Sequence, residues 1–231
     1  MNRSLLSTIE ANLNQVRLAM QAACKRSGRT EDEVRLVAVT KYAPTEALEA
    51  LAQLGFQTFG ESRPQQLMER AGQLPEGEFH LIGHLQRNKV RPVLPVAHTI
   101  HSVDSLRLLK RIDTVAAELS LRPRVLLEVN VAGEASKDGF SPTELRDAWG
   151  EAHSCEHVDI AGLMTMAPHT DEERPIRETF QGLKSLRDEL ASQRFPLPEL
   201  SMGMSGDFEI AIEEGATLIR VGSKLFAGID G

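Results

Sequence analysis

A chain of 231 residues, 41% hydrophobic and 26% charged, has ordinary globular composition and is long enough for one large domain. Its formal net charge of −7 argues against nucleic acid or an anionic membrane as a bulk partner. No segment approaches the roughly 20 apolar residues of a membrane span, and the amino terminus lacks the apolar stretch of a signal peptide. Cys24 and Cys155 are two widely separated thiols, so we expect a cytoplasmic protein with both buried.

Helical and strand-like patterns alternate along the whole chain. Residues 1–27 predict a helix, because apolar side chains recur at the spacing of one buried face, at Leu5, Ile9, Leu13, Val16 and Met20. Apolar runs typical of buried strands follow at about 34–40, 56–60, 79–83, 98–103, 123–131, 158–166, 199–204 and 216–222. Helical patterns lie between them, at about 44–54, 62–73, 85–94, 104–120, 141–153, 171–193 and 206–215.

This alternation predicts parallel strands joined by right-handed helical crossovers. Eight strands favour an α/β fold, a single (β/α)₈ TIM barrel over 34–226, preceded by one extra helix and without a second β domain. We therefore expect one domain over 1–231. A doubly wound open sheet is the alternative, but a nucleotide-binding sheet of that kind has a glycine-rich first turn, and residues 40–44 contain no glycine.

Lys41 directly follows the first predicted strand and precedes Pro44 by three residues. We expect an amine at the carboxyl end of a buried strand to be partly desolvated. Desolvation lowers the pKa of a lysine, and a neutral amine attacks carbonyl groups. The simpler interpretation is a solvated lysine that closes a strand. Tyr42 is expected to point away from such a site and to pack, since neighbours in extended chain face opposite sides.

Two glycine-containing loops predict a phosphate site. Barrels often bind phosphate with the loops after strands seven and eight, here residues 201–207 and 220–223. Glycines let the backbone approach an anion, and the hydroxyl groups of Ser205 and Ser223 add donors. Two ordinary turns with small residues are the alternative.

A strand-end lysine, a phosphate site and a strand-end arginine together predict pyridoxal 5′-phosphate (PLP) as the cofactor. Arg220 is the candidate partner of the pyridine nitrogen. Because a guanidinium stays protonated, it would donate to an unprotonated nitrogen. An unprotonated ring is a weaker electron sink, which favours binding or racemase-like reactivity.

Seven collinear motifs carry a resemblance to a known family over about 36–226: AVTKYAP, FGESRPQQ, HLIGHLQRNK, LLEVNVAGEASKDG, GLMTMAP, SMGMSGDFEIAIEEGAT and IRVGSKLF. The chain resembles the YggS/PROSC-type pyridoxal phosphate homeostasis proteins, whose fold is similar to the barrel domain of alanine racemase. The resemblance implies an internal aldimine on Lys41, phosphate contacts from Ser205, Gly222 and Ser223, and Arg220 at the pyridine nitrogen. The predicted cofactor-binding set is Lys41, Ser62, Met204, Ser205, Gly206, Arg220, Gly222 and Ser223.

The same resemblance implies a protein that buffers and delivers PLP without turnover, so no catalytic residue is predicted. PLP-dependent apo-enzymes are the implied partners, and a monomer is expected. The sequence departs from the family pattern at Ser62, where asparagine is usual, and at Ala227, which precedes Gly228 after the last motif. The first change would shorten a side-chain contact to the cofactor or replace it by water, and the second alters the terminal turn.

A PLP-dependent amino-acid racemase of the alanine-racemase type is the alternative function. Such an enzyme adds a second β domain with a catalytic tyrosine opposite the lysine, whereas this chain stops at Gly231 after the eighth strand. A lysine aldolase barrel commonly uses strand six, and residues 164–166 contain no lysine.

Two further lysines and the histidines complete the set of candidates. Lys89 and Lys137 lie near the predicted rim, and Lys137 is either a secondary PLP site or a loop cation paired with an acid. The pair His80 and His84 straddles a strand end, where four-residue spacing does not place side chains together. We therefore predict no metal site.

Overall fold

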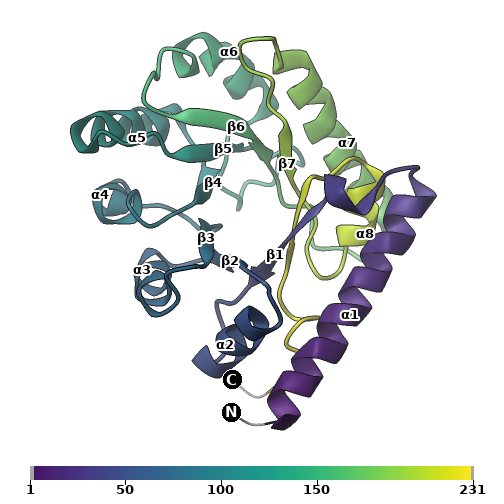
Figure 1. Cartoon of the computed structure of the whole chain (residues 1–231). Helices are drawn as coiled ribbons and strands as arrows, with labels where there is room; N and C mark the ends of the chain where they lie inside the picture. Colours follow the sequence, from purple (N-terminus) through teal and green to yellow (C-terminus); the bar gives the residue numbers. More distant parts are fainter. Residues whose placement is uncertain (1–2, 230–231) are drawn as a thin grey trace.

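The computed structural model describes residues 3–229, and its eight parallel strands close into a barrel in chain order (Figure 1). The ring closes where β1 pairs with β8, with Val37 opposite Arg220. The predicted TIM barrel is confirmed. The strands are β1 (Arg35–Val39), β2 (Thr58–Glu61), β3 (Glu78–Leu81), β4 (Thr99–Val103), β5 (Arg124–Glu128), β6 (Asp159–Met164), β7 (Glu199–Ser201) and β8 (Leu218–Val221).

Helices surround the barrel, and the long helix α1 (Arg3–Arg26) lies along its outside next to α2 (Thr45–Gln53) and α8 (Phe208–Glu213) (Figure 1). Its predicted apolar face is buried at Ile9, Leu13, Val16 and Met20. In the described part of the chain, no helix combines the length and apolarity needed to cross a bilayer. The other helices are α2 (Thr45–Gln53), α3 (Pro64–Gln73), α4 (Val90–Val93), α5 (Leu106–Leu119), α6 (Pro142–Ala152), α7 (Glu173–Leu190) and α8 (Phe208–Glu213), with 3-10 turns at Glu31–Glu33 and Arg87–Lys89.

Local sequence signals explain where several elements begin and end. At the start of α6 the Ser141 hydroxyl accepts from the Glu144 N–H, and the Glu144 carboxylate accepts from the Ser141 N–H, forming a capping box. The helix expected over 85–94 is instead a 3-10 turn followed by one short α-helical turn, and Pro95 disfavours its continuation. The strand expected over 199–204 ends at Ser201, because Gly203 adopts a positive φ of 93°.

Two apolar clusters form the core. The larger one fills the space between the barrel and the helices and contains fully buried phenylalanines such as Phe59 and Phe180. The smaller one consists of side chains from the opposite strand faces, which point into the barrel: Val37, Leu126, Ala161, Met164 and Leu218. Buried polar side chains also occupy the strands, including His80, His101, Ser201 and Arg220. The barrel is therefore a packed core whose open face is the site for function.

Candidate functional site

The carboxyl ends of the strands surround a cavity of about 890 Å³. Its walls come from the carboxyl ends of β1, β2, β3, β6, β7 and β8 and the segments that follow them, which are far apart in the sequence. The closed barrel brings them together because parallel strands with helical crossovers place all their carboxyl ends on one face. All eight residues predicted to bind the cofactor line this one cavity: Lys41, Ser62, Met204, Ser205, Gly206, Arg220, Gly222 and Ser223.

Lys41 lies in a tight turn just beyond β1. The Ala43 N–H donates to the Thr40 carbonyl over 2.9 Å, so residues 40–43 turn back instead of continuing the strand. Lys41 and Tyr42 both line the cavity, and the Lys41 Nζ lies 5.0 Å from the centre of the Tyr42 ring.

Two expectations about this turn are wrong. Tyr42 was expected to point away from the site and pack, but it lines the cavity and is 76% exposed, because strand alternation does not apply within a turn. Lys41 was expected to be partly desolvated. It is exposed, since the turn carries it past the buried end of β1.

A buried ion pair holds the Lys41 turn in place. The Arg70 guanidinium, on α3, donates to the carbonyl oxygens of Thr40 over 2.6 Å and of Ala43 over 2.7 Å. Glu61, at the end of β2, accepts a 2.7 Å hydrogen bond from Arg70 and another from the Thr40 hydroxyl. Each hydrogen bond to a charged group contributes roughly 1.5–3 kcal/mol. The backbone on both sides of Lys41 is therefore fixed.

These contacts of Arg70 were not predicted from the sequence, because only folding brings a guanidinium of α3 to the end of β1. The one available signal was a glutamate directly after a predicted buried strand, since a carboxylate that becomes buried there needs a partner. Burial raises the pKa of the Glu61 carboxyl, while the Thr40 hydrogen bond and the Arg70 charge oppose that rise.

The loops after β7 and β8 meet at one side of the cavity. The Ser205 hydroxyl accepts a 3.2 Å hydrogen bond from the Gly222 N–H, which ties the two loops together. Among residues 3–229, the backbone N–H groups of Ser205, Gly206 and Ser223 have no hydrogen-bond partner. Unpaired backbone N–H groups that line a cavity are suitable donors for an anion. The two loops have the donors that the predicted phosphate site requires.

Gly203 lets the loop after β7 pack closely against α8. A Cβ atom at this position would lie 2.5 Å from the Ala211 Cβ and 2.9 Å from the Phe208 Cα. The Met204 N–H donates to the Asp207 carboxylate over 2.5 Å, and burial raises the pKa of that carboxyl. These contacts shape the loop that presents Met204 and the two residues after it.

Arg220 reaches the floor of the cavity from β8 and is only 4% exposed. Its guanidinium donates to the Ser201 hydroxyl over 2.5 Å and to the Thr165 carbonyl over 3.0 Å. Burial lowers the pKa of Arg220 to about 10, against the opposing charges of Asp207 and Glu128. The side chain is a fixed, positively charged donor at neutral pH.

The two other candidate lysines lie elsewhere. Lys89 closes the 3-10 turn after β3, and its side chain is exposed away from the cavity lining. The Lys137 Nζ donates to the Glu134 carboxylate over 2.5 Å and to the Ala167 carbonyl over 2.8 Å. Lys137 is thus the paired loop cation that the sequence offered as one of its two roles.

Folding also brings together two groups of metal-ligating residues that the sequence did not suggest. The prediction of no metal site compared His80 with His84 at one strand end, whereas each of these groups joins residues of neighbouring segments. Within each group the ligand atoms lie within 4.8 Å of one another: Glu78, His80 and His98 in one, and His84, Asp104 and Asp138 in the other.

Comparisons with known proteins identify the family. The sequence matches the family described as alanine racemase, N-terminal domain, over residues 6–229. A pyridoxal phosphate homeostasis protein of Aquifex aeolicus is 38% identical over 217 residues, which cover 93% of this chain and 95% of the relative.

Solved structures agree with this match. PipY of Synechococcus elongatus with PLP bound is 36% identical, with a TM-score of 0.79 over 90% of this chain and 99% of that chain. Alanine racemase of Clostridium difficile shares the fold at 15% identity, with a TM-score of 0.79 over 97% of this chain and 58% of that chain. The chain therefore belongs to the alanine racemase N-terminal domain family and, within it, to the pyridoxal phosphate homeostasis proteins.

Proposed function

We propose that this protein binds PLP in the cavity at the carboxyl ends of its strands, and that it buffers and delivers the cofactor. The observation that carries the proposal is that the Lys41 amine, the unpaired backbone donors near Ser205 and the Arg220 guanidinium line one cavity. PLP presents three matching groups, which are an aldehyde, a phosphate and a pyridine nitrogen. The names of the relatives and the PLP-bound structure of PipY support the same cofactor.

In this proposal Lys41 holds the aldehyde carbon. The unprotonated Nζ attacks a carbonyl carbon and water leaves, so the bond is covalent and reversible. The hydrogen bond from Arg70 to the Thr40 carbonyl fixes the backbone next to Lys41. The exposure of Lys41 leaves the bond accessible to water and to competing amines. Reversible attachment at an open site suits a carrier that must release its cargo.

The loops after β7 and β8 hold the phosphate through the N–H groups of Ser205, Gly206 and Ser223. Glycine at 222 lets the loop after β8 pack closely against β1, since a Cβ there would lie 3.1 Å from the Val39 carbonyl oxygen. Ser62 and Met204 contribute walls of the cavity beside these donors.

Arg220 determines what the bound cofactor can do. When bound, PLP supplies an electron-accepting ring, and its accepting power depends on protonation of the pyridine nitrogen. A guanidinium that stays protonated donates a hydrogen bond to that nitrogen and leaves it unprotonated. The ring is then a weak electron sink, which supports cofactor binding or racemase-like reactivity over broad transaminase chemistry.

Borohydride reduction of the cofactor-loaded protein followed by peptide mass mapping tests the binding site. We expect a pyridoxyl group on the Lys41 peptide, its loss in Lys41→Ala, and its retention in the control Lys137→Ala, whose amine is paired with Glu134. A loaded wild-type protein without an adduct on Lys41 would contradict the proposal.

Exchange of the α-proton of alanine in deuterated water tests the absence of turnover. We expect no exchange above that of free PLP. Exchange that is catalysed by the wild-type protein and lost in Lys41→Ala would show a racemase-type activity and overturn this part of the proposal.

We propose PLP-dependent apo-enzymes as the recipients, and a cytoplasmic monomer as the working form. Both cysteines are free and buried, in keeping with a reducing compartment. Loaded protein should activate an apo-enzyme faster in the same chamber than across a dialysis membrane, and equal rates would contradict direct delivery. Sedimentation velocity checks the monomer.

A further inference from the structure

A row of buried polar side chains runs from Arg220 across the barrel. The Arg220 guanidinium contacts the Ser201 Oγ at 2.5 Å, and the same Oγ lies 2.8 Å from the His101 Nδ1. The His101 Nε2 in turn lies 2.8 Å from the His80 Nδ1. All four side chains are at least 96% buried, and they come from β8, β7, β4 and β3.

The Arg220 guanidinium determines which atom donates and which accepts in each hydrogen bond of the row. A guanidinium has no acceptor, so the Ser201 oxygen accepts from Arg220 and its hydrogen is available to the His101 Nδ1. His101 then carries its hydrogen on Nε2 and donates to the His80 Nδ1. His80 is left with its own hydrogen on Nε2. Burial lowers the pKa of His80 to about 3 and that of His101 well below its ordinary value, so both rings are neutral.

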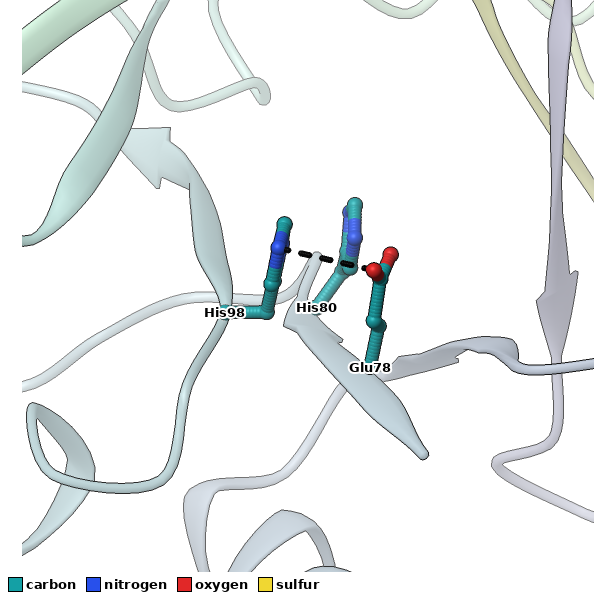
Figure 2. Close-up of side chains that lie close together, drawn as sticks. All are labelled: Glu78, His80 and His98. Carbon is teal, nitrogen blue, oxygen red and sulfur yellow. Dashed lines mark ion pairs between the residues drawn. The ribbon is translucent and has the colours of Figure 1, made fainter. Parts of the chain in front are cut away.

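The row ends at the amino-terminal end of the barrel. The His80 Nε2 is buried and has no partner among the described residues. Glu78 and His98 lie beside it, with the His98 ring 5.2 Å from the His80 ring and nearly parallel to it. Figure 2 shows the three side chains projecting to the same side of β3. An N–H at the His80 Nε2 would lie near the Glu78 carboxylate, which agrees with the donor and acceptor roles that Arg220 imposes on the row.

These three residues do not favour a metal ion. A metal at the His80 Nε2 needs the lone pair of that atom, which places the hydrogen of His80 on Nδ1 and reverses His101 as well. The Ser201 oxygen would then accept from both Arg220 and His101, and its own hydrogen would lose its acceptor. Two nearly parallel rings also do not direct their lone pairs to one point.

We propose that His101 and His80 are positioning residues for Arg220. They hold the Ser201 hydroxyl in the orientation in which its oxygen accepts from the guanidinium, and so fix the group that meets the pyridine nitrogen. The effect on PLP binding rests on the proposed function. The positions of the hydrogens on His101 and His80 are a property of the cofactor-free protein and do not depend on it.

Nitrogen-15 NMR of the imidazoles in cofactor-free protein tests these hydrogen positions without PLP. We expect both His80 and His101 to be neutral at pH 7, with hydrogen on Nε2 and a bare Nδ1. A charged ring, or hydrogen on Nδ1 of either residue, would overturn the proposal. Adding Zn²⁺ should leave these signals in place, and coordination at the His80 Nε2 would also overturn it.

PLP titrations of variants test the positioning role. His101→Leu removes both hydrogen bonds, and we expect PLP to bind about tenfold more weakly, the scale of one lost hydrogen bond. The visible absorption maximum of the bound cofactor should shift, because the contact to the ring nitrogen changes. In His101→Gln the amide oxygen can accept from Ser201 and the amide N–H can donate to His80, so we expect affinity and absorption near those of the wild type.

The exposed His98→Ala serves as the matched control, with unchanged binding. Binding and absorption of His101→Leu equal to wild type would overturn the positioning role. Failure of the wild-type protein itself to bind PLP would overturn the proposed function instead. The NMR experiment would still test the hydrogen positions on His80 and His101, because it uses cofactor-free protein.

Discussion

The Arg70 guanidinium donates a 2.6 Å hydrogen bond to the carbonyl oxygen of Thr40, the residue immediately before Lys41. The helix after β2 thereby fixes the turn after β1, and Glu61 holds the guanidinium from the end of β2. Among residues 3–229, Lys41 itself makes no comparable buried contact, so its backbone is held in place while its side chain is exposed. Such an arrangement combines a defined position with easy exchange.

Replacing Arg70 should destabilise the protein. Arg70→Met leaves Glu61 buried without its cation, and breaking a buried pair costs about 3–5 kcal/mol. We expect a loss near the lower end, because burial already raises the pKa of Glu61 and the carboxyl can take up a proton. Urea unfolding measures the effect. The double variant Arg70→Met with Glu61→Gln should recover part of the loss, and no recovery would argue against the ion pair as its source.

Removing the Ser205 hydroxyl, which links the loops after β7 and β8, should weaken the binding of PLP but not that of pyridoxal. Ser205→Ala removes the acceptor of the Gly222 N–H, so the loops lose their tie. We expect PLP to bind about tenfold more weakly, the scale of one hydrogen bond, while pyridoxal without its phosphate binds as to wild type. Equal losses for both ligands would place the effect outside a phosphate site.

Gly203 should tolerate no side chain. With φ at +93° and a Cβ position 2.5 Å from the Ala211 Cβ, Gly203→Ala meets both strain and overlap. We expect a loss of about 1–3 kcal/mol in the free energy of unfolding. Gly150→Ala, in α6 with open space around it, is the matched control and should be neutral or slightly stabilising. A harmless Gly203→Ala would contradict the tight packing of this loop on α8.

Glu128 should make stability depend on pH. Burial and the charge of Asp104 raise its pKa from 4.5 to about 7, although Arg220 opposes the rise, and Asp138 and His84 also face it. The folded protein therefore binds this proton more tightly than the unfolded chain does. The contribution is complete below about pH 4.5 and is lost as the pH rises through about 7.

The comparison with Glu128→Gln isolates this contribution, since the other titrating groups are common to both proteins. From pH 4.5 to pH 8 the wild-type protein should lose stability relative to the variant, by up to about 3 kcal/mol. Urea unfolding at several pH values measures the difference. A difference that stays constant with pH would contradict the raised pKa of Glu128.

The strand ends could be predicted from the sequence, and with them the residues of the candidate site. Lys41, Ser205 and Arg220 were found because each follows or ends an apolar run, and the barrel places every such position on one face. The amphipathic spacing of α1 and the capping box at Ser141 likewise act within a few residues of chain. Patterns of this range survive in a linear sequence, since they depend on helix and strand periodicity alone.

The tertiary structure decided how the residues around the site are held. The orientation of Tyr42 depends on a turn at which strand alternation stops. The contact of Arg70 with Thr40 joins residues 30 positions apart, and that of His101 with Ser201 joins residues 100 positions apart. Such contacts depend on the side-chain rotamers and on the register between neighbouring elements, which no local pattern records. The sequence by itself therefore determined which groups meet at the open end of the barrel, and only the fold decided which buried partners hold them there.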